Sequence, residues 1–133
     1  MPVVYLYLWP LGVKKCLRRS AIEVSWSSAK LEKACSDDRQ GRKNWGADNW
    51  KLLKRRLAAL RGSPTLADMD GAPGNCHELH ADRKGEFAMY LWGSFRLVFE
   101  PADEPLPTRP DGGIDRTQVT KIEIKEVVDY HGK

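Results

Sequence analysis

The sequence is poor in cysteine and lacks the short motifs that mark several common catalytic folds. Its 133 residues include three cysteines, Cys16, Cys35 and Cys76, at long spacings and without a CxxC pair. This pattern predicts free thiols in a reducing compartment, and so a cytoplasmic protein, instead of a disulfide framework. A P-loop, GxGxxG, GxSxG and HExxH are all missing, so the sequence gives no support to the classes of enzyme that these motifs identify.

Long apolar runs are also missing. The opening MPVVYLYLWPLGV is too short to span a bilayer, and basic residues follow the apolar run where a signal peptide would place them first. We therefore expect a protein without a membrane partner. Residues 1–20 are interpreted as a basic and apolar extension, and three interpretations of it stay open: an added edge strand, a partner-binding arm or a translated leader.

Acidic residues are absent from the first twenty positions, which hold Lys14, Lys15, Arg18 and Arg19. The net charge of +4 is therefore concentrated there, and the remainder of the chain is neutral. A basic average alone is a poor indication of nucleic-acid binding, because the clustering of charge decides it. The length fits one folded domain, which we place at residues 21–133.

The first half of this domain predicts a strand followed by two helices. IEVSW alternates apolar and polar residues, as a half-buried strand does, and Ser27 or Ser28 can cap a helix over AKLEKAC. SDDRQG is interpreted as a break, and a second helix is expected from about Ala47 to Arg61. Its outer side carries Lys51, Lys54, Arg55, Arg56 and Arg61. That basic side is either a solvated surface or a surface that faces phosphate, with Lys51, Lys54 and Arg55 as the candidate RNA contacts.

The second half predicts mainly strands. GEFAMYLW and SFRLVFE flank Gly93–Ser94, which we interpret as a two-residue hairpin turn that pairs Leu91 with Arg96. Residues 101–115 are proline-rich and acidic and predict a long loop. The last strand changes its apolar parity, which predicts a bulge near Lys125–Glu126. The expected fold class is α+β, with two N-terminal helices packed on one face of a mainly antiparallel twisted sheet of about four to five strands.

Histidines, cations and acids gather at the ends of the predicted strands. The set comprises His80, Asp82, Arg83, Lys84, Arg96, Asp129, Tyr130 and His131. An imidazole moves protons near neutral pH because its unperturbed pKa is roughly 6.5, and a guanidinium holds a phosphate at two points. Together they are sufficient to cleave RNA without a metal, by attack of the ribose 2′-hydroxyl on the adjacent phosphorus. The alternative is a zinc site from Cys76, His77 and His80, although two histidines three residues apart on a strand point to opposite faces.

Several blocks of the chain resemble a known toxin family. WKLLKRRLAALRGSPTLADM, HELHADRKGEFAMYLWGSFRLVF and EVVDYHGK match, in the same order, the basic helix, the Asp-Arg-Lys-Gly turn with its hairpin, and the Asp-Tyr-His end of the HigB-type killer toxins. These toxins belong to the RelE/ParE superfamily of type II toxin–antitoxin systems. The resemblance covers about Ile22 to Lys133 and leaves out the first twenty residues.

The resemblance implies a RelE-like toxin that cuts mRNA in the ribosomal A site, arrests growth and needs neither a metal nor another cofactor. Its partners would be the ribosome, mRNA and a HigA-like helix-turn-helix antitoxin, with which it could form a heterotetramer. The family pattern assigns proton transfer to His131, with Tyr130 and Asp129 beside it, and a phosphate or transition-state contact to Arg96. Asp82, Arg83, Lys84 and Gly85 match the turn of the family, and the two cations among them are further candidate RNA contacts.

One position departs from the family pattern. The family usually has Lys-Gly before the Asp-Arg pair, and this chain has His80-Ala81. The family lysine is a catalytic cation in some members, and losing a fixed charge opposite a phosphate can slow a reaction strongly. Two outcomes stay open: His80 serves as a second acid or base, or the protein is a weak enzyme. The alternative function is therefore a module of RelE fold that binds an antitoxin or the ribosome without cleaving.

Overall fold

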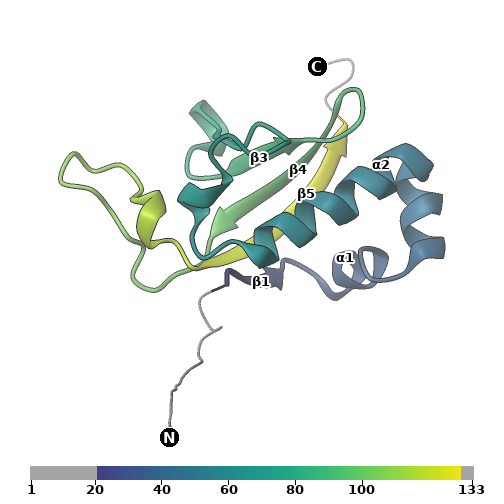
Figure 1. Cartoon of the computed structure of the whole chain (residues 1–133), viewed down its shortest axis with the longest axis horizontal. Coiled ribbons are helices and arrows are strands. Elements are labelled where there is room, and N and C mark those ends of the chain that lie inside the picture. The colour runs from purple at the N-terminus through teal and green to yellow at the C-terminus, as the bar shows by residue number, and fades with distance from the viewer. Residues whose placement is uncertain (1–20, 130–133) are drawn as a thin grey trace, which may run out of the picture.

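A five-stranded sheet, covered on one face by helices, organises the structure (Figure 1). The computed structural model describes residues 21–129. In chain order the elements, with η for a 3-10 helix, are β1 (Glu23–Trp26), α1 (Ala29–Ala34), α2 (Asp38–Gly62), η1 (Leu66–Met69), β2 (His77–Glu78), η2 (Ala81–Arg83), β3 (Phe87–Tyr90), β4 (Phe95–Pro101), η3 (Arg116–Gln118) and β5 (Lys121–Asp129). The sheet order is β1-β5-β4-β3-β2.

The sheet confirms the expected α+β class in part. Neighbouring strands from β5 through β2 are antiparallel, whereas β1 runs parallel to β5, so the sheet is mixed. The helices follow β1 in sequence and are not the first elements of the described chain. Ser28 caps α1 by accepting a hydrogen bond from the Leu31 N–H at 3.1 Å, as the sequence predicts for one of the two serines.

The core lies between α2 and the sheet. The apolar stripe predicted on the second helix is buried: Trp50, Leu53, Leu57 and Leu60 are each at most 3% exposed. These side chains share one cluster with Phe87, Met89, Leu97, Phe99, Ile122 and Ile124 of β3, β4 and β5. Figure 1 shows α2 lying across this face of the sheet. Burying a side chain of this size stabilises the fold by about 1.5–3 kcal/mol, so the core fixes which sheet face remains uncovered.

α2 consists of two helical segments that meet at a kink at Gly46, so the helix predicted from about Ala47 to Arg61 corresponds to the second segment. SDDRQG, predicted as a break, begins in the short gap after α1 and then enters an additional first segment. Asp37 caps α2 by accepting from the Arg39 N–H at 2.9 Å, and the helix begins at Asp38. The helical backbone conformation is interrupted at Gly46, whose φ of 85° only glycine adopts readily. The chain then turns back, so that the Trp50 ring packs directly on Gly41. This return could not be inferred from periodicity, since it depends on contact between two segments of one helix.

The register of the β3–β4 hairpin differs by one residue from the predicted register. Tyr90 pairs with Arg96 and Met89 with Leu97, so the loop has three residues instead of two. The reason lies in α2: Asn49 accepts the Trp92 N–H at 2.9 Å, which draws Trp92 out of the strand. A one-residue shift moves every side chain to the other face. Arg96 therefore does not lie with Met89 and Leu91, as predicted, but on the face away from the helices.

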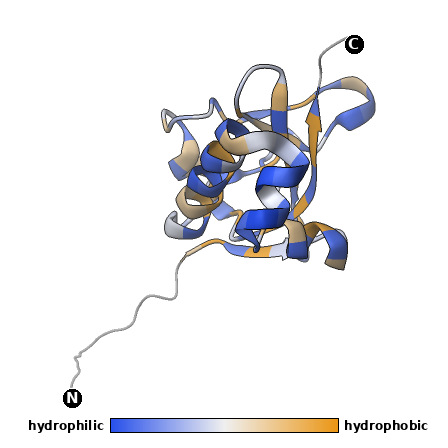
Figure 2. Cartoon of the chain, turned by 90° about the vertical axis from the view of Figure 1, so that its right-hand side faces the viewer, coloured by the Kyte–Doolittle hydropathy of each residue, from blue (hydrophilic) through white to orange (hydrophobic). Residues whose placement is uncertain are grey.

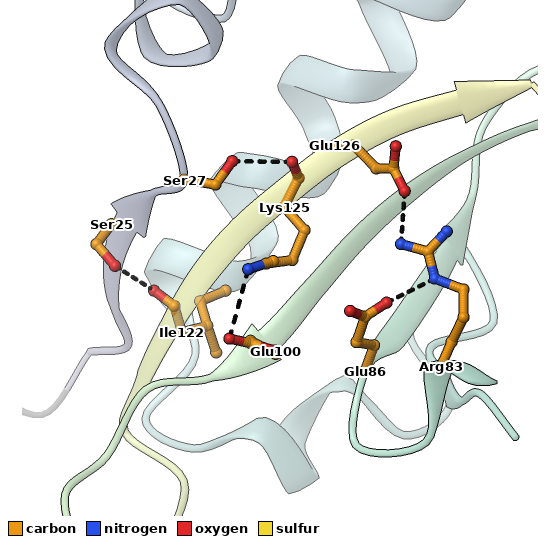
Figure 3. A network of polar contacts seen from close by, with 8 residues as sticks. All are labelled: Ser25, Ser27, Arg83, Glu86, Glu100, Ile122, Lys125 and Glu126. Atoms are coloured by element: carbon orange, nitrogen blue, oxygen red, sulfur yellow. Dashed lines mark hydrogen bonds and ion pairs between the residues drawn. The ribbon is translucent and has the colours of Figure 1, made fainter. Parts of the chain in front are cut away.

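The predicted bulge in β5 is confirmed. Val98 pairs with Glu126 and the next residue, Phe99, pairs with Ile124, which leaves Lys125 as the extra residue. Ser27 secures it by donating to the Lys125 carbonyl at 2.9 Å (Figure 3). Because of the bulge, β5 contributes apolar side chains to the core on both sides of it. Among the described helices, none combines the length and apolar character needed to cross a membrane.

Candidate functional site

The sheet face turned away from α2, called the outer face here, carries the candidate site. By strand register its residues are His77, Ala88, Tyr90, Arg96, Val98, Glu100, Glu123, Glu126 and Val128. Tyr90, Arg96 and Val128 form one row across β3, β4 and β5. The next row runs from His77 through Ala88 and Val98 to Glu126. These two adjacent rows, each with both polar and apolar members, lie over an apolar core that supports them.

Arg96 is fixed at the centre of the first row. Its Nη1 donates to the Gly93 carbonyl at 2.9 Å and to the Phe95 carbonyl at 2.8 Å. The guanidinium lies 4.1 Å from the centroid of the Tyr90 ring, which gives a cation–π contact. Tyr90 itself is 41% exposed. A cation and an aromatic ring held together at a surface can receive a phosphate and an adjacent base.

His77 joins this pair from the edge strand β2. Its ring meets the Tyr90 ring edge-on, with centroids 5.7 Å apart and planes at 81°. Its Nδ1 lies 2.7 Å from the Asn75 carbonyl. A carbonyl oxygen only accepts, so Nδ1 carries the proton and the neutral ring presents Nε2 as an acceptor. This contact was not predicted from the sequence, which suggested His77 as a zinc ligand. The signal for it lies in the β2–β3 register, which pairs His77 with Ala88, two residues before Tyr90 on the same face of β3.

Arg83 lies beside these rows and is held by two carboxylates. Its Nε donates to Glu86 at 2.6 Å and its Nη2 to Glu126 at 2.5 Å (Figure 3). These hydrogen bonds raise the pKa of the Arg83 guanidinium, which therefore stays charged at any physiological pH. Lys125 is likewise paired, with Glu100 at 3.6 Å. Both cations are thus already opposed by acids of the same face.

The predicted site residues divide between this face and the helices. Lys51, Lys54 and Arg55 are exposed on α2, on the opposite side of the sheet from Arg96 and Arg83. Lys54 pairs with Asp38 at 3.3 Å, and its contact helps to lower the pKa of that carboxyl after the larger effect of the Trp50 Nε1 hydrogen bond. The prediction that Arg56 lies on the solvated side of the helix is wrong, because its Nε donates a hydrogen bond to the Tyr90 carbonyl at 2.9 Å.

The remaining predicted residues lie at the rim or beyond the described chain. His80 and Lys84 are exposed at the two ends of η2. Asp129 ends β5 opposite Phe95 and accepts a hydrogen bond from Ser94 Oγ. Its strand parity is that of the core face, not that of Arg96. Tyr130 and His131 fall outside the described residues.

In the described part of the chain, the three candidate zinc ligands do not converge on one point. Cys76 packs against the core cluster, His77 contacts Tyr90 on the outer face, and His80 is exposed. Within residues 21–129, no group of three or more His, Cys, Asp or Glu side chains is arranged to hold a metal ion. Cys35 and Cys76 are free thiols, and burial raises the pKa of each to about 11. Neither thiol is therefore a nucleophile at neutral pH.

The comparisons with known proteins place this fold. No family model and no curated protein matches the sequence. Among solved structures, the chain is similar to a YoeB/ParE toxin from Agrobacterium tumefaciens, at a TM-score of 0.52 and 10% identity, over 83% of this chain and 100% of that one. A YoeB dimer from Staphylococcus aureus aligns at a TM-score of 0.49 and 14% identity, over 83% of this chain and 97% of that one. The protein thus shares its fold with a YoeB/ParE toxin.

Proposed function

We propose that the protein is the toxin of a type II toxin–antitoxin system and cleaves mRNA on the ribosome without a metal. The observation that carries the proposal is the arrangement of Arg96, Tyr90 and His77 on one rigid sheet face, in a fold shared with a YoeB/ParE toxin. For cleavage at a 2′-hydroxyl, an imidazole can accept the proton, a guanidinium can stabilise the charge on the phosphate oxygens, and an exposed aromatic ring can stack on an adjacent base. The HigB subtype is part of the proposal and depends on the sequence resemblance.

The reaction proposed is a transesterification. The 2′-hydroxyl loses its proton to an imidazole, its oxygen bonds to phosphorus, and the bond from phosphorus to the 5′-oxygen breaks. The products are a 2′,3′-cyclic phosphate and a 5′-hydroxyl, which receives a proton from a second group. Nε2 of His77 is one proton acceptor for this step, and His131 is the other group assigned to proton transfer. Arg96 opposes the charge that develops on the non-bridging oxygens, while Tyr90 stacks on a base.

Partner binding is proposed for separate surfaces. A HigA-like antitoxin and the ribosome are the partners, and the cytoplasm is where both occur. Lys51 and Arg55 of α2 are the proposed contacts with RNA phosphates, because both are exposed and residues 50–61 of the helix contain no acid. Lys54 is a weaker candidate, since Asp38 already pairs with it.

A second candidate function is a RelE-fold module that binds its partners without cleaving. Two observations favour it: His80 occupies the position of the family lysine, and the outer face carries carboxylates, which repel phosphate. Induced expression separates the two candidates. Cleavage predicts mRNA fragments with 2′,3′-cyclic phosphate ends, formed by purified protein that has been stripped of metal with a chelator and then added to intact ribosomes. Growth arrest by wild type and by His131→Ala alike, without such fragments, would favour the non-cleaving module.

A further inference from the structure

The η2 turn between β2 and β3 is closed at its base by a backbone hydrogen bond from the Leu79 N–H to the Glu86 carbonyl at 2.8 Å, and one side chain connects it to β5. Its own backbone hydrogen bonds are local: the Lys84 N–H donates to the Ala81 carbonyl at 3.1 Å, and the Glu86 N–H to the Arg83 carbonyl at 2.9 Å. Ala81 has a φ of 58°, a left-handed conformation that disfavours a residue with a Cβ. The turn therefore depends on contacts beyond itself to keep its position.

Arg83 supplies that contact by reaching from the turn to β5. Figure 3 shows its guanidinium between Glu86 at the start of β3 and Glu126 on β5. Glu126 is separated from the turn by β4, because it pairs with Val98, which pairs in turn with Ala88 of β3. Val98 and Ala88 lie on the outer face and outside the core cluster, yet they are 0% and 1% exposed. The outer face is thus covered at its centre, where Arg83 crosses it.

We propose that Arg83 is a positioning residue, a strap that ties the η2 turn to β5 through Glu126 and so holds His80 and Lys84 beside the outer face, instead of binding RNA itself. Two carboxylates against one guanidinium leave a net negative charge at this point, which repels a phosphate. The strap stands on the geometry alone, whereas the use of His80 and Lys84 in cleavage rests on the proposed function.

Amide hydrogen exchange tests the strap without any need for activity. Protection of the Lys84 amide is measured in Arg83→Gln, in Glu126→Gln and in the double variant. We expect about a tenfold loss of protection in each single variant and no further loss in the double, because either change releases the same contact. The matched control is Glu100→Gln, which breaks the neighbouring Lys125–Glu100 pair and should leave Lys84 protected. Unchanged protection in Glu126→Gln, or effects that add in the double variant, would overturn the strap.

The direction of the effect on RNA separates a strap from an RNA contact. Affinity for a short single-stranded RNA is measured with the same variants. If Arg83 is a strap, Arg83→Gln and Glu126→Gln both weaken binding, because both release the turn. Tighter binding by Glu126→Gln than by Glu100→Gln, which removes the same charge, would mean that the released guanidinium binds phosphate, which contradicts the proposal. If wild-type protein neither binds nor cleaves RNA, the proposed function fails, and the exchange measurement still decides whether the strap exists.

Discussion

The helical layer and the sheet side of the protein differ in the sign of their charge. Residues 27–62, which form α1 and α2, carry ten basic and four acidic side chains. Residues 63–129, which include β2 to β5 and their loops, carry seven basic and thirteen acidic ones. Figure 2 views the end of the molecule where the helices lie, with many hydrophilic positions along their ribbons. The almost neutral described chain is thus two regions of opposite charge.

The difference in charge suggests that the helical layer attracts RNA, whereas the sheet carries the groups that would react with it. A region with an excess of cations attracts any polyanion at long range, without selecting a base or a bond. The outer face has too many carboxylates for that task, but it holds Arg96, Tyr90 and His77 in defined orientations. We therefore expect binding to depend on many replaceable cations of α1 and α2, and cleavage to depend on a few irreplaceable groups of the sheet. The predictions below set one region against the other.

The largest effect is expected from Arg96→Ala. Loss of a charge that opposes a developing oxyanion should lower cleavage by about 10²–10³-fold and abolish growth arrest, while the fold stays intact. Growth after induced expression is measured together with the circular dichroism of purified protein. The matched control is Lys125→Ala, a cation of the same sheet side that Glu100 already occupies. A soluble Arg96→Ala protein with full toxicity would remove Arg96 from the mechanism.

The second effect concerns the stability of the helical layer. A Cβ on Gly41 would lie 2.2 Å from Cε3 of Trp50, whereas nothing lies within 4 Å of a Cβ on Gly62. Gly41→Ala should lower the free energy of unfolding by about 1–3 kcal/mol through overpacking, measured by urea denaturation. Gly62→Ala, at the end of the same helix, should change it by less than about 1 kcal/mol. Equal effects would mean that the Trp50 contact does not limit the packing of α2.

Local signals in the sequence predicted much of the fold. The Ser28 cap, the apolar stripe of α2, and the bulge at Lys125 each follow from residues close together in the chain. The additional helical segment before Gly46 was not predicted, and the predicted hairpin register was wrong, for the opposite reason. Each depends on contacts between segments far apart in sequence or folded back on themselves, Trp50 on Gly41 and Asn49 on Trp92.

The same distinction applies to the candidate site. The sequence shows which residue types are present, but not which face of the sheet each one occupies. A shift of one residue in the hairpin register changes the face on which Arg96 lies. Lys51 and Arg55, predicted as RNA contacts, lie on α2, which covers the face of the sheet opposite to that of Arg96. The role of Arg83 was also hidden, because Glu126 is 43 residues away in sequence. The roles assigned to Tyr130 and His131 remain predictions.

The third effect should appear in RNA binding. The double variant Lys51→Gln/Arg55→Gln should weaken binding to a structured RNA about tenfold at physiological salt and reduce the salt slope by about two, one for each lost phosphate contact. Arg109→Gln/Lys121→Gln removes the same charge from the sheet side and serves as the matched control. Fluorescence anisotropy over a range of salt measures both. Equal losses in the two variants would mean that net charge alone, and not the helical layer, governs binding.

The smallest effect is expected at His80, which is exposed at the start of the η2 turn on the sheet side. If His80 acts as a cation beside the phosphate, a lysine at this position should serve better at high pH, because an ammonium keeps its charge where an imidazole does not. The ratio of the His80→Lys rate to the wild-type rate should therefore increase between about pH 6 and pH 8 and reach roughly threefold to tenfold near pH 8. Arg96→Lys is the control, since it preserves a charge at every pH and should change the rate without changing the shape of the profile. Matching profiles for wild type and His80→Lys would leave His80 without a role as a cation and would place all proton-dependent steps with the other histidines.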